Sequence, residues 1–504
     1  MPVVPDKGTV LKWSRIELRR SLSAPLFWVD RPFIMKKFAL TIFFILLASP
    51  AWATTHYLAP ASEGGSDNNN GASASAPWLS PNHAVNCGDV ILAAASTAYD
   101  AANFASGKWG AVTCSAGNNV AWLKCTTFDT CKTTVSGNHG MQVSSSYWGV
   151  QGWEVTVTGG IYFGCFTAVP PGTSVIHHII FANDIANGCY GSGFQANNVN
   201  TVGVDYSVVV GSIAYNAAQG DGECYSGISD AGPTNSDSLP GTHVYIAGNF
   251  AWDNVDPNPC GGGAPTDGEG IIADTYNGNG TGSVYSGQTV IANNILVSNG
   301  GRGIQAFFNN VGLTAPIYIY NNTTWNNNGD KNQYATFCGE ILLSFAFTSD
   351  VYANIAETTA AAGCGSNPLY AYYVGGGNST DQIHNTWGWS AAGNDCGTNP
   401  TIVCGPNNTF SNPNFAKPTT PGAPKCAGFA SVPACMATVI ANFKPQAKSA
   451  SGYGYQAPSS AKTYDPLFPQ WLCNVNLPAG LVTMGCLSSS SLPAAPTGLN
   501  VTAQ

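Results

Sequence analysis

The sequence predicts an all-β protein, a parallel β-helix in which one chain winds into a solenoid of stacked coils. A short phrase recurs along the middle of the chain, as in "VYIAGNFAWDN" and "IYIYNNTTWNN": an alternating apolar strand, then an Asn or Ser, then a polar turn. The aligned residues are Asn183, Ser212, Asn249, Asn294, Asn322 and Asn354, at spacings of 29, 37, 45, 28 and 32. A period-2 pattern repeating about every 30 residues indicates β-coils, because helical solenoids share the repeat length but not the alternation.

The repeated Asn has a physical reason. Side-chain amides at one turn position of successive coils stack about 4.8 Å apart and hydrogen-bond to the coils above and below. "GVQGWEVTVTG" fits the pattern one coil earlier, at Trp153, and "IHNTWGW" fits it loosely afterwards. We therefore expect the β-helix to occupy residues 54–416.

The first 53 residues are expected to stand apart from this domain. "MKKFALTIFFILLASPAWA", residues 35–53, has a Lys-Lys head, a short apolar run and a small-residue cleavage site, which is typical of a signal peptide. Residues 1–34 are interpreted as an upstream extension. The apolar run is too short to span a membrane. We expect a protein without a membrane anchor that is secreted, extracellular or periplasmic.

Charge and cysteine content limit the kinds of partner and of cysteine chemistry that the protein can have. The chain holds 27 Asp and Glu against 18 Lys and Arg, a net charge of −9, which disfavours nucleic acid and anionic membranes as partners. Sixteen cysteines in an exported protein favour disulfides over metal thiolates. Close spacing suggests the pairs Cys125–Cys131, Cys396–Cys404, Cys426–Cys435 and Cys473–Cys486.

The repeat stops near Lys417. Residues 417–488 are rich in Pro, Cys and Ser and are expected to form a disulfide-pinned cap over the open end of the coil stack, which protects a strand edge from pairing with another chain. "LPAAPTGLNVTAQ" then reads as a linker and the possible first strand of a fibronectin type III module, over residues 489–504. We expect a monomer.

The stretch from "THYLAPASEGGSDNNNGASASAPW" to "WGWSAAG" resembles the pectate-lyase-like superfamily of right-handed parallel β-helix proteins. Its opening, followed by "NCGDVILAAAS", is similar to the entry strand of polysaccharide lyase family 9-like proteins. The resemblance implies a right-handed β-helix that acts on a polysaccharide. It leaves the activity open, because the superfamily includes lyases, hydrolases, esterases and non-enzymes.

A second family of strands shares the core x-Gly-apolar and places four residues in one column. Ser192, Ser226, Glu269 and Arg302 follow one another at spacings of 34, 43 and 33. Stacked coils would therefore set Glu269 one strand spacing from Arg302. No Lys or Arg occurs between Thr133 and Gly301, so Arg302 is the expected partner of Glu269.

One arginine cannot neutralise the three carboxylates of "APTDGEGIIADTY", which are Asp267, Glu269 and Asp274. Ca²⁺ accepts such oxygen ligands in irregular geometry, so these residues are a candidate calcium site. Asp267 and Glu269 share a strand face, whereas Asp274 needs a turn to join them. The alternative is a set of solvated carboxylates at a strand end.

Two long excursions, Gln219–Thr242 and Asp256–Gly270, flank this column and are expected to form the walls of a cleft. Cys224 and Cys260 could join them.

Tyr225, Trp252 and Tyr276 are candidate sugar-stacking aromatics, and His243 is a candidate to reach the cleft. Simple packing is the alternative for each of them.

Three functions use this site. The favoured one is an enzyme that cleaves an acidic polysaccharide by calcium-assisted β-elimination, in which a base removes the C5 proton of a uronic acid. The resemblance implies a lysine base beside an all-Asp calcium site. The acidic coils here carry no lysine, so the base would be Arg302, or Lys331 from "NNNGDKNQY".

The second function is a glycoside hydrolase, which needs two carboxylates about 5 to 9.5 Å apart. Glu269 could pair with Asp267, with Asp274, or with Asp230 of the preceding coil. The third is a non-catalytic glycan-binding or adhesin-like protein, in which the carboxylates are solvated and the Asn residues are structural.

Overall fold

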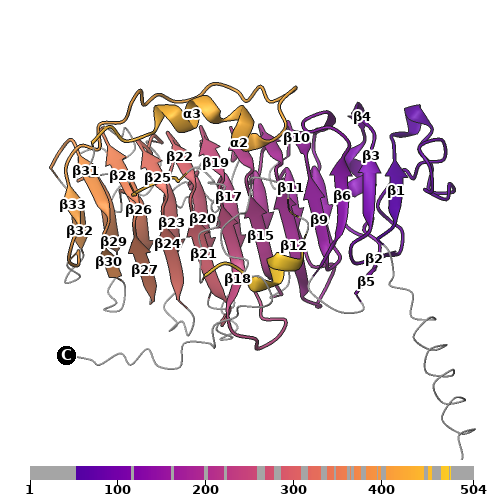
Figure 1. Cartoon of the computed structure of the whole chain (residues 1–504), viewed down its shortest axis with the longest axis horizontal. Coiled ribbons are helices and arrows are strands. Elements are labelled where there is room, and N and C mark those ends of the chain that lie inside the picture. Colours follow the sequence, from indigo (N-terminus) through magenta and orange to yellow (C-terminus); the bar gives the residue numbers. More distant parts are fainter. Residues whose placement is uncertain are drawn as a thin grey trace, which may run out of the picture. The chain divides into compact units, whose positions relative to one another are not determined.

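The computed structural model describes residues 53–477, except 115–118, 161–163, 198–201, 221–223, 258–266, 277–284, 308–315, 331–337, 345–347, 360–363, 365–367, 376–381, 394, 399–403, 448–451, 457–466 and 476. The expected extension, the signal peptide and the fibronectin-like start lie outside the described residues. The described chain is the right-handed parallel β-helix that the sequence predicts, with successive coils side by side (Figure 1). No helix in the described part is long and apolar enough to cross a membrane.

Three parallel sheets, each taking one strand from successive coils, make up the described β-helix. Sheet 1 contains β1 Thr55–Leu58, β3 Val90–Ala93, β6 Ala121–Cys125, β9 Trp148–Gln151, β12 Ile176–Ala182, β15 Val204–Val210, β18 Thr242–Ala247, β21 Gln288–Ala292, β24 Ile317–Tyr320, β27 Ser349–Tyr352 and β30 Gln382–His384. Sheet 2 contains β4 Ser96–Tyr99, β7 Cys131–Val135, β10 Trp153–Val157, β13 Ile185–Asn187, β16 Ile213–Tyr215, β19 Phe250–Trp252, β22 Ile295–Val297, β25 Thr323–Trp325, β28 Ile355–Thr358, β31 Trp387–Ser390 and β33 Thr409–Phe410. Sheet 3 contains β8 Met141–Val143, β11 Phe166–Ala168, β14 Phe194–Ala196, β17 Ile228–Ala231, β20 Ile271–Asp274, β23 Ile304–Phe307, β26 Gly339–Ser344, β29 Tyr370–Gly375 and β32 Cys396–Thr398.

The remaining elements are short. β2 Val85–Asn86 pairs with β5 Val112–Thr113 near the start of the solenoid. The helical turns are η1 Ala61–Glu63, η2 Ala101–Phe104, α2 Val432–Cys435, α3 Ala437–Asn442 and η6 Gln470–Asn474.

The predicted Asn ladder lies at the bend between sheet 1 and sheet 2. The backbone N–H and the side-chain amide of Asn249 both donate to Oδ1 of Asn294, at 2.9 and 3.1 Å. Asn294 repeats this pattern on Asn322, and Asn322 on Asn354. These side chains are fully buried, so each coil satisfies the buried polar groups of its neighbour.

One member of the predicted alignment is wrong by one residue. The strand pairing places Ile185 opposite Ile213, so Asp184 and not Asn183 is in register with Ser212. Asp184 accepts from the backbone N–H of Trp153 at 2.9 Å, while Asn183 has φ of 60° and occupies the bend. Asn tolerates positive φ better than most residues, which is why this coil carries an Asn one position early.

Large apolar side chains fill the inside of the coils, and other apolar side chains point outward from sheets 1 and 2. The outward residues of sheet 2, including Ile213 and Phe250, pack under residues of the 413–456 segment such as Val432 and Phe443. Figure 1 shows α2 and α3 running across these strands.

The outward residues of sheet 1, including Val208 and Tyr245, pack against Phe468, Trp471 and Leu472. We call residues 413–477 the tail. The expectation of a cap over the open end is therefore corrected: the described tail covers the sides of the coils, because their outward apolar residues require shielding from water.

Disulfides join neighbouring parts of the solenoid. The predicted pairs Cys125–Cys131, Cys396–Cys404 and Cys426–Cys435 are confirmed. Three further pairs, which spacing did not suggest, are Cys87–Cys114, Cys165–Cys189 and Cys338–Cys364. Cys224 and Cys473 are also disulfide-bonded, whereas their predicted partners Cys260 and Cys486 lie outside the described residues.

Candidate functional site

The predicted column forms at the start of the sheet 3 strands. Strand pairing aligns Phe194, Ile228, Ile271 and Ile304, so the residues two positions earlier, Ser192, Ser226, Glu269 and Arg302, are in register. Nη1 of Arg302 donates to Oε1 of Glu269 at 3.0 Å. The hydroxyl of Ser226 donates to Oε2 of Glu269 at 2.9 Å, and the backbone N–H of Ser226 donates to Ser192 Oγ at 3.4 Å.

The ion pair is buried, with Glu269 0% and Arg302 3% exposed. The chain makes room for it at Gly301. A Cβ on that residue would lie 2.7 Å from the carbonyl oxygen of Asp267 and 2.8 Å from Oε1 of Glu269. The "NGGRG" sequence therefore lets one coil approach the carboxylate of the coil before it.

Asp267 and Asp274 flank the pair. Withdrawal from water raises the pKa of Asp267 well above its ordinary value, and the charges of Glu269 and Asp274 raise it further against the opposing effect of Arg302. Burial raises the pKa of Asp274 to about 6, and the Glu269 charge adds to this increase. Asp267 and Asp274 both keep partial exposure, so two carboxyl groups with raised pKa values meet solvent in this cluster.

The backbone beside Asp274 is strained. Thr275 has φ of 56°. Among the described non-glycine residues with positive φ, it is the only β-branched one. Its hydroxyl donates to Oδ1 of Asp274 at 2.7 Å. Such conformations cost on the order of 1–3 kcal/mol and gather at functional sites.

The calcium site predicted at Asp267, Glu269 and Asp274 stays a prediction. Among the described residues, no three His, Cys, Asp or Glu side chains come together to hold a metal ion. Glu269 already accepts from Arg302 and Ser226 on its two oxygens. Carboxylate oxygens are ligands that calcium accepts, so a calcium ion at Asp267 and Asp274 stays a prediction.

The predicted base is also revised. Arg302 donates to Glu269 within a buried ion pair, and an arginine engaged in this way is a poor candidate for a proton acceptor. Its role here is to hold Glu269. Lys331, the other predicted base, lies outside the described residues.

The predicted sugar-stacking residues are not surface platforms. Trp252 is 1% exposed and lies in the apolar cluster under the tail, with Phe250 and Met436. Tyr276 is 2% exposed, and its hydroxyl donates to Asp230 inside the coil. A sugar cannot stack on rings that the protein itself covers, so these two predictions are wrong as stated.

Tyr225 and His243 are also buried. Tyr225 is 8% exposed and its carbonyl oxygen accepts from the N–H of Gly268 at 2.8 Å, so it borders the carboxylate coil without presenting a ring. The ring of His243 is 1% exposed and stacks on Tyr206 at 3.8 Å. Its Nδ1 contacts Asp205 at 2.9 Å and its Nε2 contacts the carbonyl of Leu239 at 3.0 Å, so His243 fastens the wall segment instead of facing a cleft.

A buried polar network that the sequence reasoning missed centres on Asp205. Its carboxylate accepts from Tyr285 Oη at 2.7 Å and from the N–H and hydroxyl of Ser236, in addition to His243. These donors hold the pKa of Asp205 below its ordinary value, although burial opposes them. The signal in the sequence was a lone Asp within the apolar strand "VGVDYSVVV".

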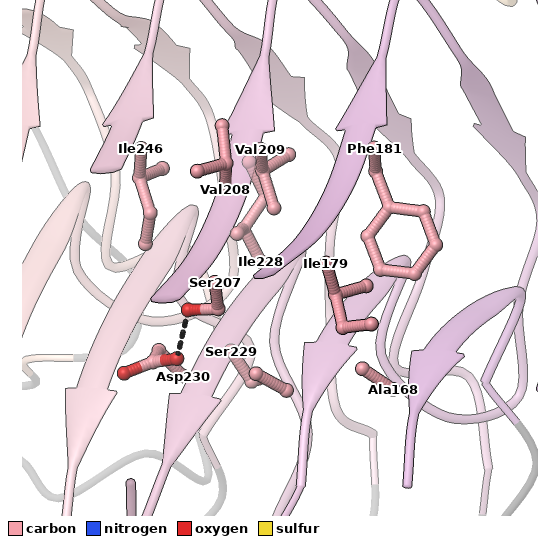
Figure 2. Close-up of a pocket in the computed structure, with 11 residues that line it drawn as sticks. Ala168, Ile179, Phe181, Ser207, Val208, Val209, Ile228, Ser229, Asp230 and Ile246 are labelled. Carbon is pink, nitrogen blue, oxygen red and sulfur yellow. Dashed lines mark hydrogen bonds between the residues drawn. The ribbon is translucent and has the colours of Figure 1, made fainter. Parts of the chain in front are cut away.

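Asp230, the alternative hydrolase carboxylate, lines an interior cavity. It accepts from Ser207 Oγ at 2.8 Å beside a small cavity lined by Ile179, Phe181 and Ile228 (Figure 2). Burial raises the pKa of Asp230 to about 6. The cavity has about 10 Å³ for the centre of a water molecule, which is too little for a sugar, so Asp230 is corrected to an interior residue.

Comparison with known proteins gives structural neighbours only. No protein-family model and no curated protein sequence matches the chain. A crystal structure of pectate lyase Pel9A is 16% identical, covers 86% of this chain and 96% of its own, and has a TM-score of 0.44. The A-module of the mannuronan C-5 epimerase AlgE4 of Azotobacter vinelandii is 13% identical over 65% of this chain and 90% of its own, with a TM-score of 0.28.

The likeness is one of fold. The fold assignment rests on the strand pairing described above. What the chain does has to be argued from its own carboxylates.

Proposed function

We propose that the chain is an enzyme that cleaves an acidic polysaccharide, with Asp267, Glu269, Asp274 and Arg302 as its active centre. The carrying observation is the difference between two neighbouring carboxyl groups: burial and neighbouring charges raise the pKa of Asp267, whereas Glu269 accepts hydrogen bonds from Arg302 and Ser226. A carboxyl group with a raised pKa beside a carboxyl group that is paired with an arginine is an arrangement suited to acid–base chemistry. The strained Thr275 next to Asp274 supports the same location.

Two chemistries fit. Calcium-assisted elimination from a uronic acid remains the first proposal, and a cation beside Asp267 and Asp274 would offset the burial and the carboxylate repulsion that raise their pKa values. Hydrolysis is the second, with the partly exposed Asp267, whose pKa burial raises, as the general acid.

The test follows absorbance near 235 nm and new reducing ends while the protein meets pectic, alginate and glycosaminoglycan substrates, with Ca²⁺ and with a chelator. A calcium-dependent rise identifies elimination, and reducing ends without absorbance identify hydrolysis. Asp267→Asn should abolish either activity, whereas Glu63→Gln, at an exposed residue of the first coils, should leave it unchanged. Neither signal with any substrate contradicts the proposal and favours a glycan-binding protein.

A further inference from the structure

Four rings form a column on the outer face of sheet 1. Tyr147, His178, Tyr206 and His243 come from successive coils and stack in that order, with ring centroids 4.8, 4.3 and 3.8 Å apart. Tyr147, His178 and Tyr206 have positive φ, of 65°, 59° and 49°. Residues with large side chains rarely adopt this conformation, and backbone strain of this kind gathers at binding sites and switches.

The end of the tail packs on this column. The indole of Trp471, in η6, lies edge-on to His178 and to Tyr206, with ring centroids 4.8 and 5.9 Å apart. His178 and Trp471 are each 6% exposed. The indole N–H of Trp471 is buried and has no hydrogen-bond partner. Because a buried donor without an acceptor is unfavourable, the contact at Trp471 depends on apolar packing.

A second histidine, His177, lies beside this contact. Nδ1 of His177 is 2.9 Å from Nδ1 of His178. One of these nitrogens donates and the other accepts, so the bond requires that one of the two rings carry no proton at this position. A first added proton places a positive charge beside the tail. A second added proton breaks the bond and sets two positive charges against each other.

The surroundings provide no free counter-charge for a histidinium. In the described part of the chain, the charged groups that act on the pair are Asp205, Asp237 and His243. Asp205 already bonds to His243, and Asp237 accepts from the hydroxyl of Tyr206 at 3.1 Å. Residues 467–475 of the tail contain no Asp or Glu. A protonated ring is therefore not compensated by the segment that covers it.

The direction of the pH effect follows from this burial. Burial, together with the charge of His177, lowers the pKa of His178 from 6.5 to about 3, and burial also lowers the pKa of His177. Above pH 6.5 the rings are neutral whether or not the tail is bound. Between 6.5 and about 3 the uncovered face takes up a proton that the covered face excludes. Tail binding therefore weakens as pH falls, by up to about tenfold per pH unit for one proton.

We propose that His177 and His178 form an acid switch that detaches residues 467–475 from the outer face of sheet 1 while the coils stay folded. Detachment exposes the apolar side chains that this segment covers, such as Val208 and Tyr245. The switch does not depend on the proposed polysaccharide-cleaving function, because it lies on sheet 1 and the carboxylate cluster lies on sheet 3.

The test is His178→Tyr, which removes the titrating ring. Tyr147 and Tyr206 occupy the same register position on the neighbouring coils, also with positive φ, so a tyrosine fits there. Hydrogen–deuterium exchange, normalised to the unfolded chain at each pH, compares residues 467–475 with β24 at about pH 7 and about pH 4. In wild type, residues 467–475 should lose protection about tenfold or more at the lower pH, while β24 stays protected. His178→Tyr should keep both segments protected.

Two further variants sharpen the comparison. His178→Phe keeps a ring without a hydroxyl and should behave as His178→Tyr does. His139→Phe is the matched control, because His139 precedes β8 of sheet 3 and burial lowers its pKa to about 4. It should release the tail as wild type does. Nile red, an uncharged probe of apolar surface, should gain fluorescence at the lower pH in wild type and His139→Phe only.

Three results overturn the proposal. The first is equal protection of residues 467–475 at both pH values in wild type. The second is an equal loss of their protection in wild type, His178→Tyr and His178→Phe, which places the responsible proton elsewhere. The third is a joint loss of protection in residues 467–475 and β24, which shows global acid unfolding. None of these measurements requires a substrate, so failure of the cleavage function leaves the switch standing.

Discussion

Glu269 and Arg302, 33 residues apart in sequence, lie on adjacent coils and form an ion pair at 3.0 Å that is almost wholly withdrawn from solvent. Because both charges are withdrawn from water, such a pair adds little net stability. Removing one partner is nevertheless strongly destabilising, because it leaves the other charge buried without compensation. The pair therefore couples the chemistry of the candidate site to the integrity of two coils.

The first prediction concerns this coupling. Arg302→Ala leaves the Glu269 carboxylate buried without its cation and should lower the free energy of unfolding by about 3–5 kcal/mol. The double variant Glu269→Leu/Arg302→Leu removes both charges and should lose less. Chemical denaturation of the three proteins measures the difference, and equal losses in the single and double variants would contradict the buried-pair account.

A second prediction separates packing from sugar binding at Trp252. Because its ring is covered by the tail, Trp252→Ala should lower the free energy of unfolding by about 3–5 kcal/mol while KM stays at the wild-type value. Denaturation curves and substrate titration at a temperature where the variant is folded measure both. A stable variant with a raised KM would restore the sugar-stacking role.

The Asn ladder provides a third prediction. The side chain of Asn322 donates to Asn354, Ile291 and Tyr320 and accepts from Asn294. Asn322→Ala leaves several buried groups unpaired and should lower the free energy of unfolding by roughly 3 kcal/mol or more.

Asn408→Ala, at the less buried end of the ladder, is the control and should lose less. Denaturant melts compare the two, and similar losses would show that ladder position is irrelevant.

The fourth prediction concerns pH. Burial raises the pKa of Glu357 to about 7 from an ordinary value of 4.5. Below pH 4.5 the carboxyl is neutral in both states, so its folded form incurs no penalty. Between 4.5 and about 7 the unfolded chain ionises while the folded chain retains the proton, so stability falls as pH rises.

Burial also raises the pKa of Glu340 to about 8, which adds to this fall up to that pH. The unfolding midpoint should therefore decrease between pH 4.5 and 8, and Glu357→Gln should flatten the decrease. Glu63→Gln, at an exposed residue, is the control. A midpoint that rises over this range would contradict the assigned directions.

The sequence predicted what depends on register. Strands spaced by whole coils bring residues of one column together whatever the loops do, so the Glu269–Arg302 pair followed from the spacing of two x-Gly-apolar cores. Alignment by spacing was wrong at Asn183, because the bend position and the neighbouring ladder position both accept Asn. Only the strand pairing shows that Asp184 occupies the ladder position.

Burial could not be predicted in this way. Alternation shows that Trp252 points outward from sheet 2, but not that a segment more than 150 residues later covers it. Long-range coverage is a tertiary property that local patterns do not carry.

The tail also constrains the order of folding. The N–H of Val432 donates to Oδ1 of Asn183, 249 residues earlier, and Thr242 donates to the carbonyl of Leu467, 225 residues later. The coils can form progressively from neighbouring segments. The apolar outer faces of sheets 1 and 2, however, stay exposed to water until the tail packs on them. A nascent or prematurely terminated chain that lacks the tail would therefore expose apolar surface. It would be prone to self-association and dependent on chaperones until the tail covers these faces.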